Sequence, residues 1–304
     1  MENQAIVTIL TPTYNRVDKL IDLYQTLCMQ KDKRFVWCVV DDGSTDSTEN
    51  AIKEVVNNSP FSLIYIKKEN GGKHTALNEG IKLAATPLVF IVDSDDTLMP
   101  DAVETIAIYF EKYKEDEEIC GFSFLRAFSD GKINGSLFAK DEWIASYIDA
   151  RVNSNDMASD KAEVYKTKCL REFPFPVYEN EKFLGEDIVW TRMARKYKTV
   201  HINKAIYVGE YQSDGLTRNR RLHNLNSPNG CVTRAKEYLE NDICLKMRIK
   251  SYPQYLIYGM VAKHKFKSLL KDAPNKFLCL LLFFPALFIM INWTRQYKNK
   301  KSRD

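Results

Sequence analysis

Several signatures of common enzyme and metal-binding classes are missing from this 304-residue sequence. It has no CxxC pair, and its seven cysteines are odd in number and widely spaced, so neither a disulfide framework nor a cysteine zinc site is indicated. The four histidines include no pair with metal-ligand spacing on one helix, so the sequence does not support a zinc hydrolase. It also lacks a GxSxG nucleophile elbow, a Walker loop and a GxGxxG dinucleotide fingerprint.

The N-terminus lacks a basic cluster and a long apolar run. Met1–Gln4 carries an acid, and the apolar segment after it is only as long as a strand. We therefore expect no secretory signal peptide, reduced thiols and a catalytic part in the cytoplasm. The composition, with 45% hydrophobic and 28% charged residues, is that of a globular protein, and we expect one large domain with an appendage.

The net charge of +4 is unevenly distributed. Residues 231–304 carry 15 Lys and Arg against five Asp and Glu, a balance of +10, which leaves −6 for residues 1–230. Basic segments can bind nucleic acid, but no recognised nucleic-acid module accompanies this one. The apolar run within the basic segment favours a lipid surface as its partner, and we expect no nucleic acid.

Short apolar runs alternate with amphipathic stretches through the first hundred residues, which predicts βαβ units and a parallel sheet. The predicted strands are Ile6–Thr11, Phe35–Val40, Leu63–Ile66 and Leu88–Val92, and two of the predicted helices are Glu49–Val56 and Ala102–Tyr113. Further strands are expected in ICGFSFLRAF (119–128) and AEVYKTKCL (162–170). In an open α/β sheet, ligands bind at the carboxyl ends of the strands, so the loops at these ends are the candidate site.

Two of these loops are acidic. Asp41 and Asp42 end the second predicted strand, and Asp93, Asp95 and Asp96 follow the fourth. If these carboxylates converge at one edge they would repel one another, and Mg²⁺ or Mn²⁺ bridging to phosphate oxygens would remove the conflict. The alternative is that the aspartates only form turns and helix caps. For the first loop the two interpretations are about equal, whereas three carboxylates in four residues exceed what a turn requires.

The order and spacing of five motifs carry a family resemblance. ILTPTYNR, VVDDGSTDST, ENGGKHTALNEGI, VFIVDSDDTLMPDAV and GEDIVW succeed one another between residue 6 and about residue 190. This succession resembles the family 2 glycosyltransferases, which transfer sugars with inversion and have a GT-A fold. The resemblance implies a nucleotide-sugar donor, with a UDP-sugar as the expected one, and a divalent metal, Mn²⁺ or Mg²⁺.

The resemblance also implies roles for residues that bind the nucleotide. Pro12 and Tyr14 are expected to line the base, and Asp42 to accept a hydrogen bond from the uracil N3. Lys73 is expected to approach the base or the diphosphate. Asp93 is expected to reach the ribose.

The remaining acids are assigned to metal binding and catalysis. Asp95 is the best candidate for the metal ligand, with Asp96 next to it. In the motif Gly185-Glu186-Asp187, the resemblance favours Asp187 as the base that deprotonates the acceptor hydroxyl, with Glu186 assisting or orienting the acceptor. The alternative is that both are acids at the start of a helix-like run, Ile188–Tyr197, where they complement the helix dipole.

One family motif is missing. The QxxRW motif of processive synthases is absent, and residues 211–219 read YQSDGLTRN instead, so processive polymer synthesis is not expected. The expected acceptor is a membrane-held, polyprenyl-linked saccharide in surface-polysaccharide assembly. The alternative function is a catalytically silent GT-A-like module that binds nucleotide or anchors an assembly. A nucleotidyltransferase would need a glycine-rich loop after the first strand, and TPTYNR has no glycine.

The tail contains an apolar run of 15 residues, Phe277–Ile291, which is short for a membrane span. Pro285 lies at its middle and is expected to break or kink a helix, and basic residues flank both sides. We therefore expect a helix that lies on, or dips into, the cytoplasmic leaflet of the plasma membrane; the alternative is a core helix with solvated ends. The expected division is a catalytic domain over 1–230, with halves meeting at residue 115, and a helical tail over 231–304.

Overall fold

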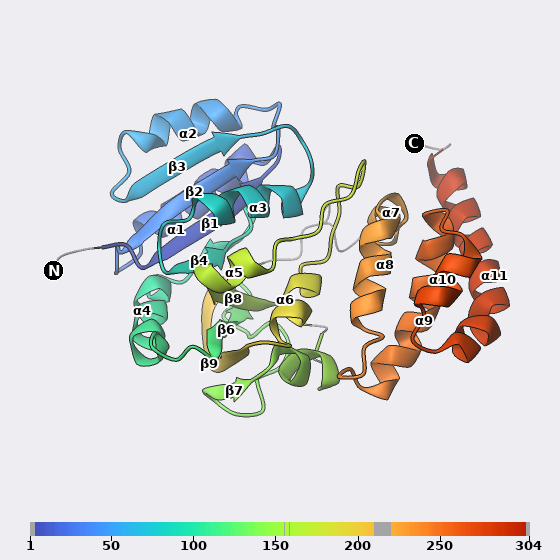
Figure 1. Cartoon of the computed structure of the whole chain (residues 1–304). Helices are drawn as coiled ribbons and strands as arrows, with labels where there is room; N and C mark the ends of the chain where they lie inside the picture. The colour runs from blue at the N-terminus through green and yellow to red at the C-terminus, as the bar shows by residue number, and fades with distance from the viewer. Residues whose placement is uncertain (1–3, 155, 158, 210–219, 302–304) are drawn as a thin grey trace. The chain divides into compact units, whose positions relative to one another are not determined.

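A computed structural model describes residues 4–154, 156–157, 159–209 and 220–301 of the chain (Figure 1). The chain divides into two compact units. Unit 1 comprises Met1–Phe175 and Arg192–Tyr211, and unit 2 comprises Pro176–Thr191 and Gln212–Asp304. The boundaries that the sequence suggests, at residues 115 and 230, stay predictions. Residues 211–219, which replace the processive motif, lie outside the described residues.

Unit 1 begins with four parallel strands in the order β3-β2-β1-β4. All four predicted strands are confirmed, as β1 (Val7–Thr13), β2 (Phe35–Asp41), β3 (Ser62–Lys67) and β4 (Leu88–Ile91). Every residue of β1 and β4 is buried, as expected for strands that helices cover on both faces. The intervening helices are α1 (Val17–Cys28), α2 (Thr48–Val56) and α3 (Lys73–Leu83). The predicted helix Ala102–Tyr113 is confirmed as α4.

The sheet continues beyond β4 with mixed strand directions, and among the described residues it has nine strands in all. Its other members are β5 (Thr97–Leu98), β6 (Ile119–Ala127), β7 (Trp143–Ala145), β8 (Lys161–Lys166) and β9 (Lys198–Val208). A π-helical turn, η1 (Ile148–Asn153), precedes β8. The strand expected to continue to Leu170 ends at Lys166, where α5 (Thr167–Glu172) begins. Lys166 pairs with Leu88, the first residue of β4, so the strand has no partner beyond that point.

The core of unit 1 lies between the sheet and its helices. Trp37 of β2 is fully buried, stacks on Tyr24 of α1 at 5.8 Å between ring centroids, and donates its indole N–H to Thr11 at 3.0 Å. Phe122 and Phe124 of β6 are also fully buried. This packing holds β1, β2 and β4 side by side, so the loops at their carboxyl ends share one edge of the sheet (Figure 1).

Unit 2 is helical. Its helices are α7 (Arg220–Asn226), α8 (Pro228–Glu237), α9 (Leu245–Val261), α10 (Phe266–Asp272) and α11 (Lys276–Lys301). The unit also contains the start of α6 (Asp187–Met193), which is shorter than the helix-like run expected to continue to Tyr197. Its core includes Tyr252, Tyr255 and Leu256 of α9, together with Cys279 and Ala286 of α11.

Of the break or kink expected at Pro285, the break is wrong, because α11 runs as one helix through that residue, and the kink stays a prediction. Proline removes one backbone hydrogen bond and costs about 3 kcal/mol in a helix interior. Burial of Cys279 and Ala286 against the core of unit 2 opposes this cost on both sides of Pro285. α9 likewise contains Pro253 and is anchored by buried tyrosines.

Burial of His201 in β9 makes the stability of unit 1 depend on pH. Its fully buried imidazole lies 4.8 Å from the ring of Phe138 and 5.8 Å from that of Trp143. Burial, and then the positive charges of Arg151 and Lys161, lower the pKa of His201 from 6.5 to about 4. The unfolded chain therefore takes up this proton first as the pH falls, so the stabilisation is complete above pH 6.5 and decreases towards pH 4.

We expect the wild-type protein to lose about 2 kcal/mol of unfolding free energy through this group between pH 7.5 and pH 5. The variant His201→Phe has no proton to bind and should lose correspondingly less over that interval. Denaturant unfolding at the two pH values measures the difference, with His264→Phe, at an exposed position, as the control. An equal pH dependence of wild type and His201→Phe would contradict the assignment.

Candidate functional site

The loops after β1 and β2 are fastened to each other at the sheet edge. The backbone N–H of Asp42 donates to the carbonyl of Thr13 at 2.9 Å. Asn15 accepts from the N–H of Thr45 at 2.7 Å, and its own N–H donates to the Ser44 hydroxyl at 2.9 Å. Asn15 adopts a φ of 51°, a conformation that asparagine tolerates better than most residues. These contacts give the edge a fixed backbone.

Pro12 and Tyr14 lie at this edge in different surroundings. Pro12 is buried in β1 beside Val40 of β2, whereas the Tyr14 side chain is 47% exposed just beyond the strand. The exposed Tyr14 ring is therefore accessible to a flat ligand at the strand ends, whereas Pro12 is buried in the sheet at the same edge. Their roles in binding a base stay predictions.

The two aspartates after β2 are held by the chain's own donors. Asp41 accepts from the N–H of Ser44 at 2.7 Å and from the Tyr65 hydroxyl at 2.7 Å. Asp42 accepts from four donors, which are the Lys68 ammonium at 2.8 Å, the Asn70 amide at 3.2 Å and the N–H groups of Gly71 at 2.9 Å and Gly72 at 2.7 Å. Both aspartates are buried, and among the described residues the group of carboxylates that lie within 4.8 Å of one another includes neither of them.

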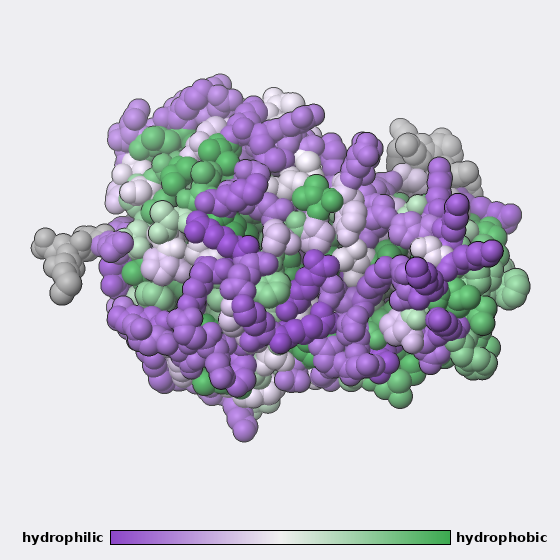
Figure 2. Space-filling model, in the orientation of Figure 1, coloured by the Kyte–Doolittle hydropathy of each residue, from purple (hydrophilic) through white to green (hydrophobic). Residues whose placement is uncertain are grey.

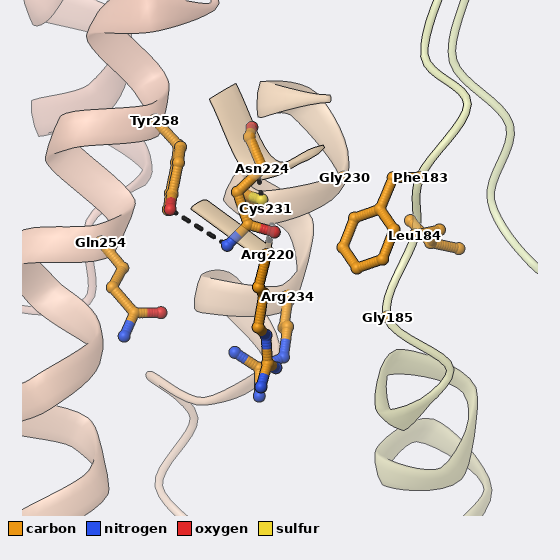
Figure 3. A pocket seen from close by; sticks show the side chains of 10 residues that line it. All are labelled: Phe183, Leu184, Gly185, Arg220, Asn224, Gly230, Cys231, Arg234, Gln254 and Tyr258. Atoms are coloured by element: carbon orange, nitrogen blue, oxygen red, sulfur yellow. Dashed lines mark hydrogen bonds between the residues drawn. The ribbon is translucent and has the colours of Figure 1, made fainter. Parts of the chain in front are cut away.

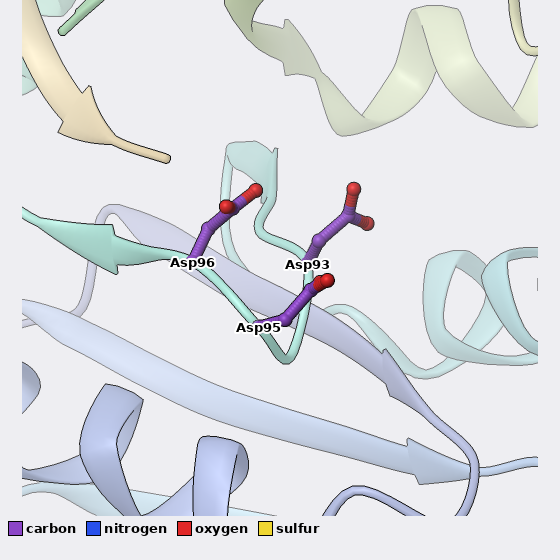
Figure 4. A group of neighbouring side chains, drawn as sticks. All are labelled: Asp93, Asp95 and Asp96. Carbon is purple, nitrogen blue, oxygen red and sulfur yellow. The ribbon is translucent and has the colours of Figure 1, made fainter. Parts of the chain in front are cut away.

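Asp93, Asp95 and Asp96 do converge. They project from one tight loop after β4 (Figure 4), and one carboxylate oxygen of each lies within 4.8 Å of the others. The loop is fixed by hydrogen bonds from the N–H of Val92 to the carbonyl of Leu10 at 3.0 Å and from the N–H of Asp96 to the carbonyl of Asp93 at 3.2 Å. We refer to these three carboxylates as the acidic loop.

Each carboxylate of the acidic loop faces a cation from another part of unit 1. The Lys73 ammonium lies 2.5 Å from Asp93, and the Arg16 guanidinium forms an ion pair with Asp95. The Arg126 guanidinium lies 3.5 Å from Asp96. The three cations come from the start of α3, the loop before α1 and β6, so the charge balance depends on the fold.

Asp96 has a second partner in Tyr207 of β9. The Tyr207 hydroxyl donates to Asp96 at 2.7 Å and accepts from the N–H of Asp93 at 3.0 Å. The guanidinium of Arg126 stacks over the Tyr207 ring at 3.8 Å from its centroid. Asp96 is therefore held from two strands. Its position is more constrained than that of Asp95, which pairs with Arg16 and has an 18% exposed side chain.

The pKa values within the acidic loop diverge. Burial raises the pKa of Asp96 to about 6, against the opposing charge of Arg126 and with support from the neighbouring charge of Asp93. Burial also acts to raise the pKa of Asp93, but the charges of Lys73 and Arg126 outweigh it and lower that pKa. The pKa of Arg126 is raised because Tyr207, Asp96 and Asp93 together outweigh its burial. The acidic loop thus concentrates negative charge in a small volume, and cations near its carboxylates stabilise that charge.

The donor set of the acidic loop fits a hard divalent cation. Mg²⁺ and Mn²⁺ prefer oxygen ligands and use one or two protein carboxylates together with phosphate oxygens. The acidic loop offers three such groups within reach of one ion. Arg16 and Lys73 now occupy two of them, and the same two cations are suited to phosphate oxygens.

Sequence reasoning did not identify three residues around the acidic loop. Arg16 stands in the TPTYNR motif, so its position in a strand-end loop was a usable signal. Arg126 and Tyr207 lie within strands and belong to no motif, and only the paired register of β6 and β9 brings them together. A single sequence gives no means of reading that register.

In unit 2, Asp187 is fixed by two partners from α8 and its end. Asp187 Oδ2 accepts from Arg234 Nε at 2.6 Å and from the Tyr238 hydroxyl at 2.5 Å. A Cβ at Gly185 would lie 2.5 Å from Asp187 Oδ1, so glycine is what permits this approach. Asp187 is also the first residue of α6, and both interpretations of the motif, helix-start acid and positioned carboxylate, fit its geometry.

Glu186 and the preceding segment complete this site. The Glu186 carbonyl accepts from the N–H of Val189 at 2.9 Å, which starts the turn that presents Asp187. Glu181 accepts from the N–H groups of Asn229 at 2.8 Å and Gly230 at 2.9 Å, and so caps the start of α8 with a buried carboxylate. The segment is thereby fastened to the helix that carries Arg234.

Comparison with known proteins shows a clear family match. The profile of "Glycosyl transferase family 2" matches residues 8–145. The chain is 26% identical over 224 residues to the glycosyltransferase GlyA of Streptococcus pneumoniae serotype 4, covering 70% of this chain and 31% of GlyA. It is 24% identical over 272 residues to the minor teichoic acid biosynthesis protein GgaB of Bacillus subtilis, covering 87% of this chain and 29% of GgaB. The chain thus spans about three tenths of each of these relatives.

Solved structures show the shared fold. Residues 1–349 of S. aureus TarS superimpose with a TM-score of 0.64 at 19% identity, covering 98% of this chain and 91% of that one. The same TarS fragment in complex with UDP-GlcNAc gives a TM-score of 0.61 at 18% identity, covering 98% and 92%. The predicted α/β GT-A fold, with an apolar helix near the C-terminus, is confirmed.

Proposed function

Residues 8–145 belong to glycosyl transferase family 2, and from this we propose that the chain transfers a sugar from a nucleotide-sugar to a saccharide acceptor, with inversion at the anomeric carbon. The observation that carries the proposal is the acidic loop. It presents three carboxylates at the carboxyl ends of parallel strands, where an α/β sheet binds its ligands. Its ion pairs with Arg16 and Lys73 add two groups suited to a diphosphate.

For the donor we propose a UDP-sugar. The TarS fragment that shares this fold was solved with UDP-GlcNAc, which supports the choice. Tyr14 and Pro12 would contact the base, and Asp93 the ribose. Asp42 would accept from the uracil N3, and since it already accepts from four donors, the base would share or displace one of them.

For the metal site we propose Asp95 as the principal ligand of Mn²⁺ or Mg²⁺, with Asp96 beside it. A bound divalent ion would stabilise the negative charge of the departing diphosphate. Asp95 is the more exposed of the two and forms its ion pair with a side chain from a loop, so it can exchange partners. Arg16 and Lys73, once displaced from their carboxylates, would bind the diphosphate oxygens.

For the base we propose Asp187. Inverting transfer needs one carboxylate that takes the proton of the acceptor hydroxyl. Arg234 and Tyr238 both bind Oδ2, which leaves Oδ1 as the oxygen that would meet the hydroxyl. Glu186 would orient the acceptor.

For the acceptor we propose a saccharide held at the membrane by a polyprenyl carrier, at the inner face of the plasma membrane. GgaB acts in teichoic acid biosynthesis, by its name, which supports a surface polymer. Within unit 2, α11 is long and apolar enough to cross a membrane by length and composition. One of its faces packs on the core through Cys279 and Ala286.

The opposite face of α11 favours a helix that lies in the membrane surface. That face is apolar and exposed, and Figure 2 shows apolar surface over this helix; its residues are Phe277, Leu280, Leu281, Phe284, Phe288 and Ile291. A helix with protein along one side and an apolar stripe along the other fits the plane of the bilayer surface. Exposed lysines at 263, 265, 267 and 271 would bind anionic headgroups.

The metal proposal predicts the effect of Asp95→Asn. Without this carboxylate, the affinity for Mn²⁺ in the presence of UDP should fall at least about 10-fold, and sugar transfer should be nearly abolished while the fold survives. Calorimetry and a transfer assay measure the two effects, and Asp22→Asn, at an exposed site on α1, is the control. Full turnover by metal-stripped protein in EDTA would contradict the proposal.

The base proposal predicts a separate phenotype for Asp187→Asn. Because the carboxylate accepts a proton only during transfer, the turnover rate should fall about 10²-fold or more while UDP affinity stays unchanged. Asp272→Asn removes a surface carboxylate that is also paired with a cation, Lys236, and serves as the control. If Asp187→Asn transfers sugar at the parental rate, Asp187 is only a helix-start acid.

The membrane proposal predicts the effect of Phe284→Ser/Phe288→Ser. These side chains are 75% and 74% exposed, so removing them should leave unfolding unchanged. Each buried phenylalanine contributes about 2 kcal/mol, so binding to anionic vesicles should fall at least about 10²-fold. Ile108→Ser/Leu137→Ser, at exposed apolar positions of unit 1, is the control. Wild-type protein that does not sediment with anionic vesicles would refute the proposal.

A further inference from the structure

Unit 2 contains a small hollow beside the Gly185-Glu186-Asp187 motif. It is bounded by the segment before α6 and by α7, α8 and α9 (Figure 3). Its lining residues are Phe183, Leu184, Gly185, Arg220, Asn224, Gly230, Cys231, Arg234, Gln254 and Tyr258. None of these is acidic.

The polar groups of the hollow are dominated by hydrogen-bond donors. Two guanidiniums, those of Arg220 and Arg234, line it together and converge in the view of Figure 3. The amides of Asn224 and Gln254 and the hydroxyl of Tyr258 add neutral polar groups, with Asn224 donating to Tyr258 at 3.1 Å. A site with two guanidiniums and no carboxylate in its lining attracts an anion.

The two arginines differ in their partners. Arg234 donates Nε to Asp187 at 2.6 Å. Arg220 makes no ion pair with any carboxylate of the described residues, although it lines the same hollow. Arg220 therefore brings to the hollow a guanidinium that pairs with no carboxylate of the described residues, and an anionic ligand would pair with it.

The size of the hollow limits the ligand. It has about 20 Å³ for water-sized groups, and one such group needs about 10 to 15 Å³. One or two oxygens fit, whereas a sugar ring does not. Planar guanidiniums bind the paired oxygens of phosphate or carboxylate well, and the ligand that fits is therefore a small oxyanion.

We propose that this hollow binds an oxyanion carried by the acceptor, and that Arg220 and Arg234 are the residues that recognise it. The proposal names a substrate class and rests on the proposed function. Since Arg234 also holds Asp187, an oxyanion in the hollow would lie next to the group proposed to deprotonate the acceptor. Acidic acceptors would then be bound in preference to neutral ones. A phosphodiester and a uronate carboxylate are the two sources of this chemistry.

The test measures anion binding without divalent metal, in EDTA, so that the acidic loop has no ion through which to bind a phosphate. Inorganic phosphate is titrated by calorimetry into the wild type and into Arg220→Gln. The substitution should weaken binding at least about 10-fold, because it removes a charge-assisted pair. Arg221→Gln is the matched control. Arg221 is the next residue on α7 and stacks on Trp293 at 4.7 Å, and it does not line the hollow.

Glycerol 3-phosphate and glucuronate, titrated in the same way, distinguish the two sources. Tighter Arg220-dependent binding of one of them identifies the acceptor as a phosphate polymer or as an acidic saccharide. Equal phosphate affinity in wild type and Arg220→Gln would overturn the proposal, whatever the transfer activity. Arg220-dependent binding in a protein that transfers no sugar would instead remove the proposed function and leave the anion site in place.

Discussion

The sheet edge of unit 1 depends on three carboxylates in one loop. Each of them faces a cation from a different part of the chain. At separations below 4.8 Å, each pair of these charges repels by about 3.5 kcal/mol or more at an effective dielectric constant of about 20. Arg16, Lys73 and Arg126 balance that repulsion, and they are in place only when β1, α3 and β6 have assembled. The edge is therefore a consequence of the complete sheet.

The same balance explains how the edge could act. Arg126 is buried and stacked on Tyr207, so Asp96 keeps its partners, whereas Arg16 comes from a loop and pairs with the partly exposed Asp95. A metal ion bound to a diphosphate would offer a positive charge to Asp95 and negatively charged oxygens to Arg16. Exchange of the ion pair for the metal-bound nucleotide would keep every charge compensated. In unit 2, Asp187 is held by Arg234 in the same manner.

The sequence predicts the local elements well and the assembly of the site only in part. β1, β2, β4 and α4 follow from apolar periodicity because they bury their apolar side chains, and β3 follows because Leu63 and Tyr65 pack against the core. The acidic loop was predicted because its three aspartates are adjacent in the chain. Arg126 and Tyr207 were not, because the register of β6 against β9 brings them together. The hydrogen bonds of Asp42 could not be predicted either, because its four donors lie about thirty residues further along the chain. At Pro285, packing of α11 on its unit outweighed the local preference against a helix.

The most direct test of the account follows the Arg16 guanidinium itself. Side-chain ¹⁵N signals of the arginines are recorded by NMR before and after addition of Mg²⁺ and UDP, with Arg16 assigned from an Arg16→Lys variant. The account predicts that the Arg16 signal shifts when both are added. Arg34, whose guanidinium pairs with Asp32 on the same unit, should not shift. An Arg16 signal that is unchanged at saturating Mg²⁺ and UDP would show that the Asp95 ion pair is permanent and that the acidic loop does not bind a metal nucleotide.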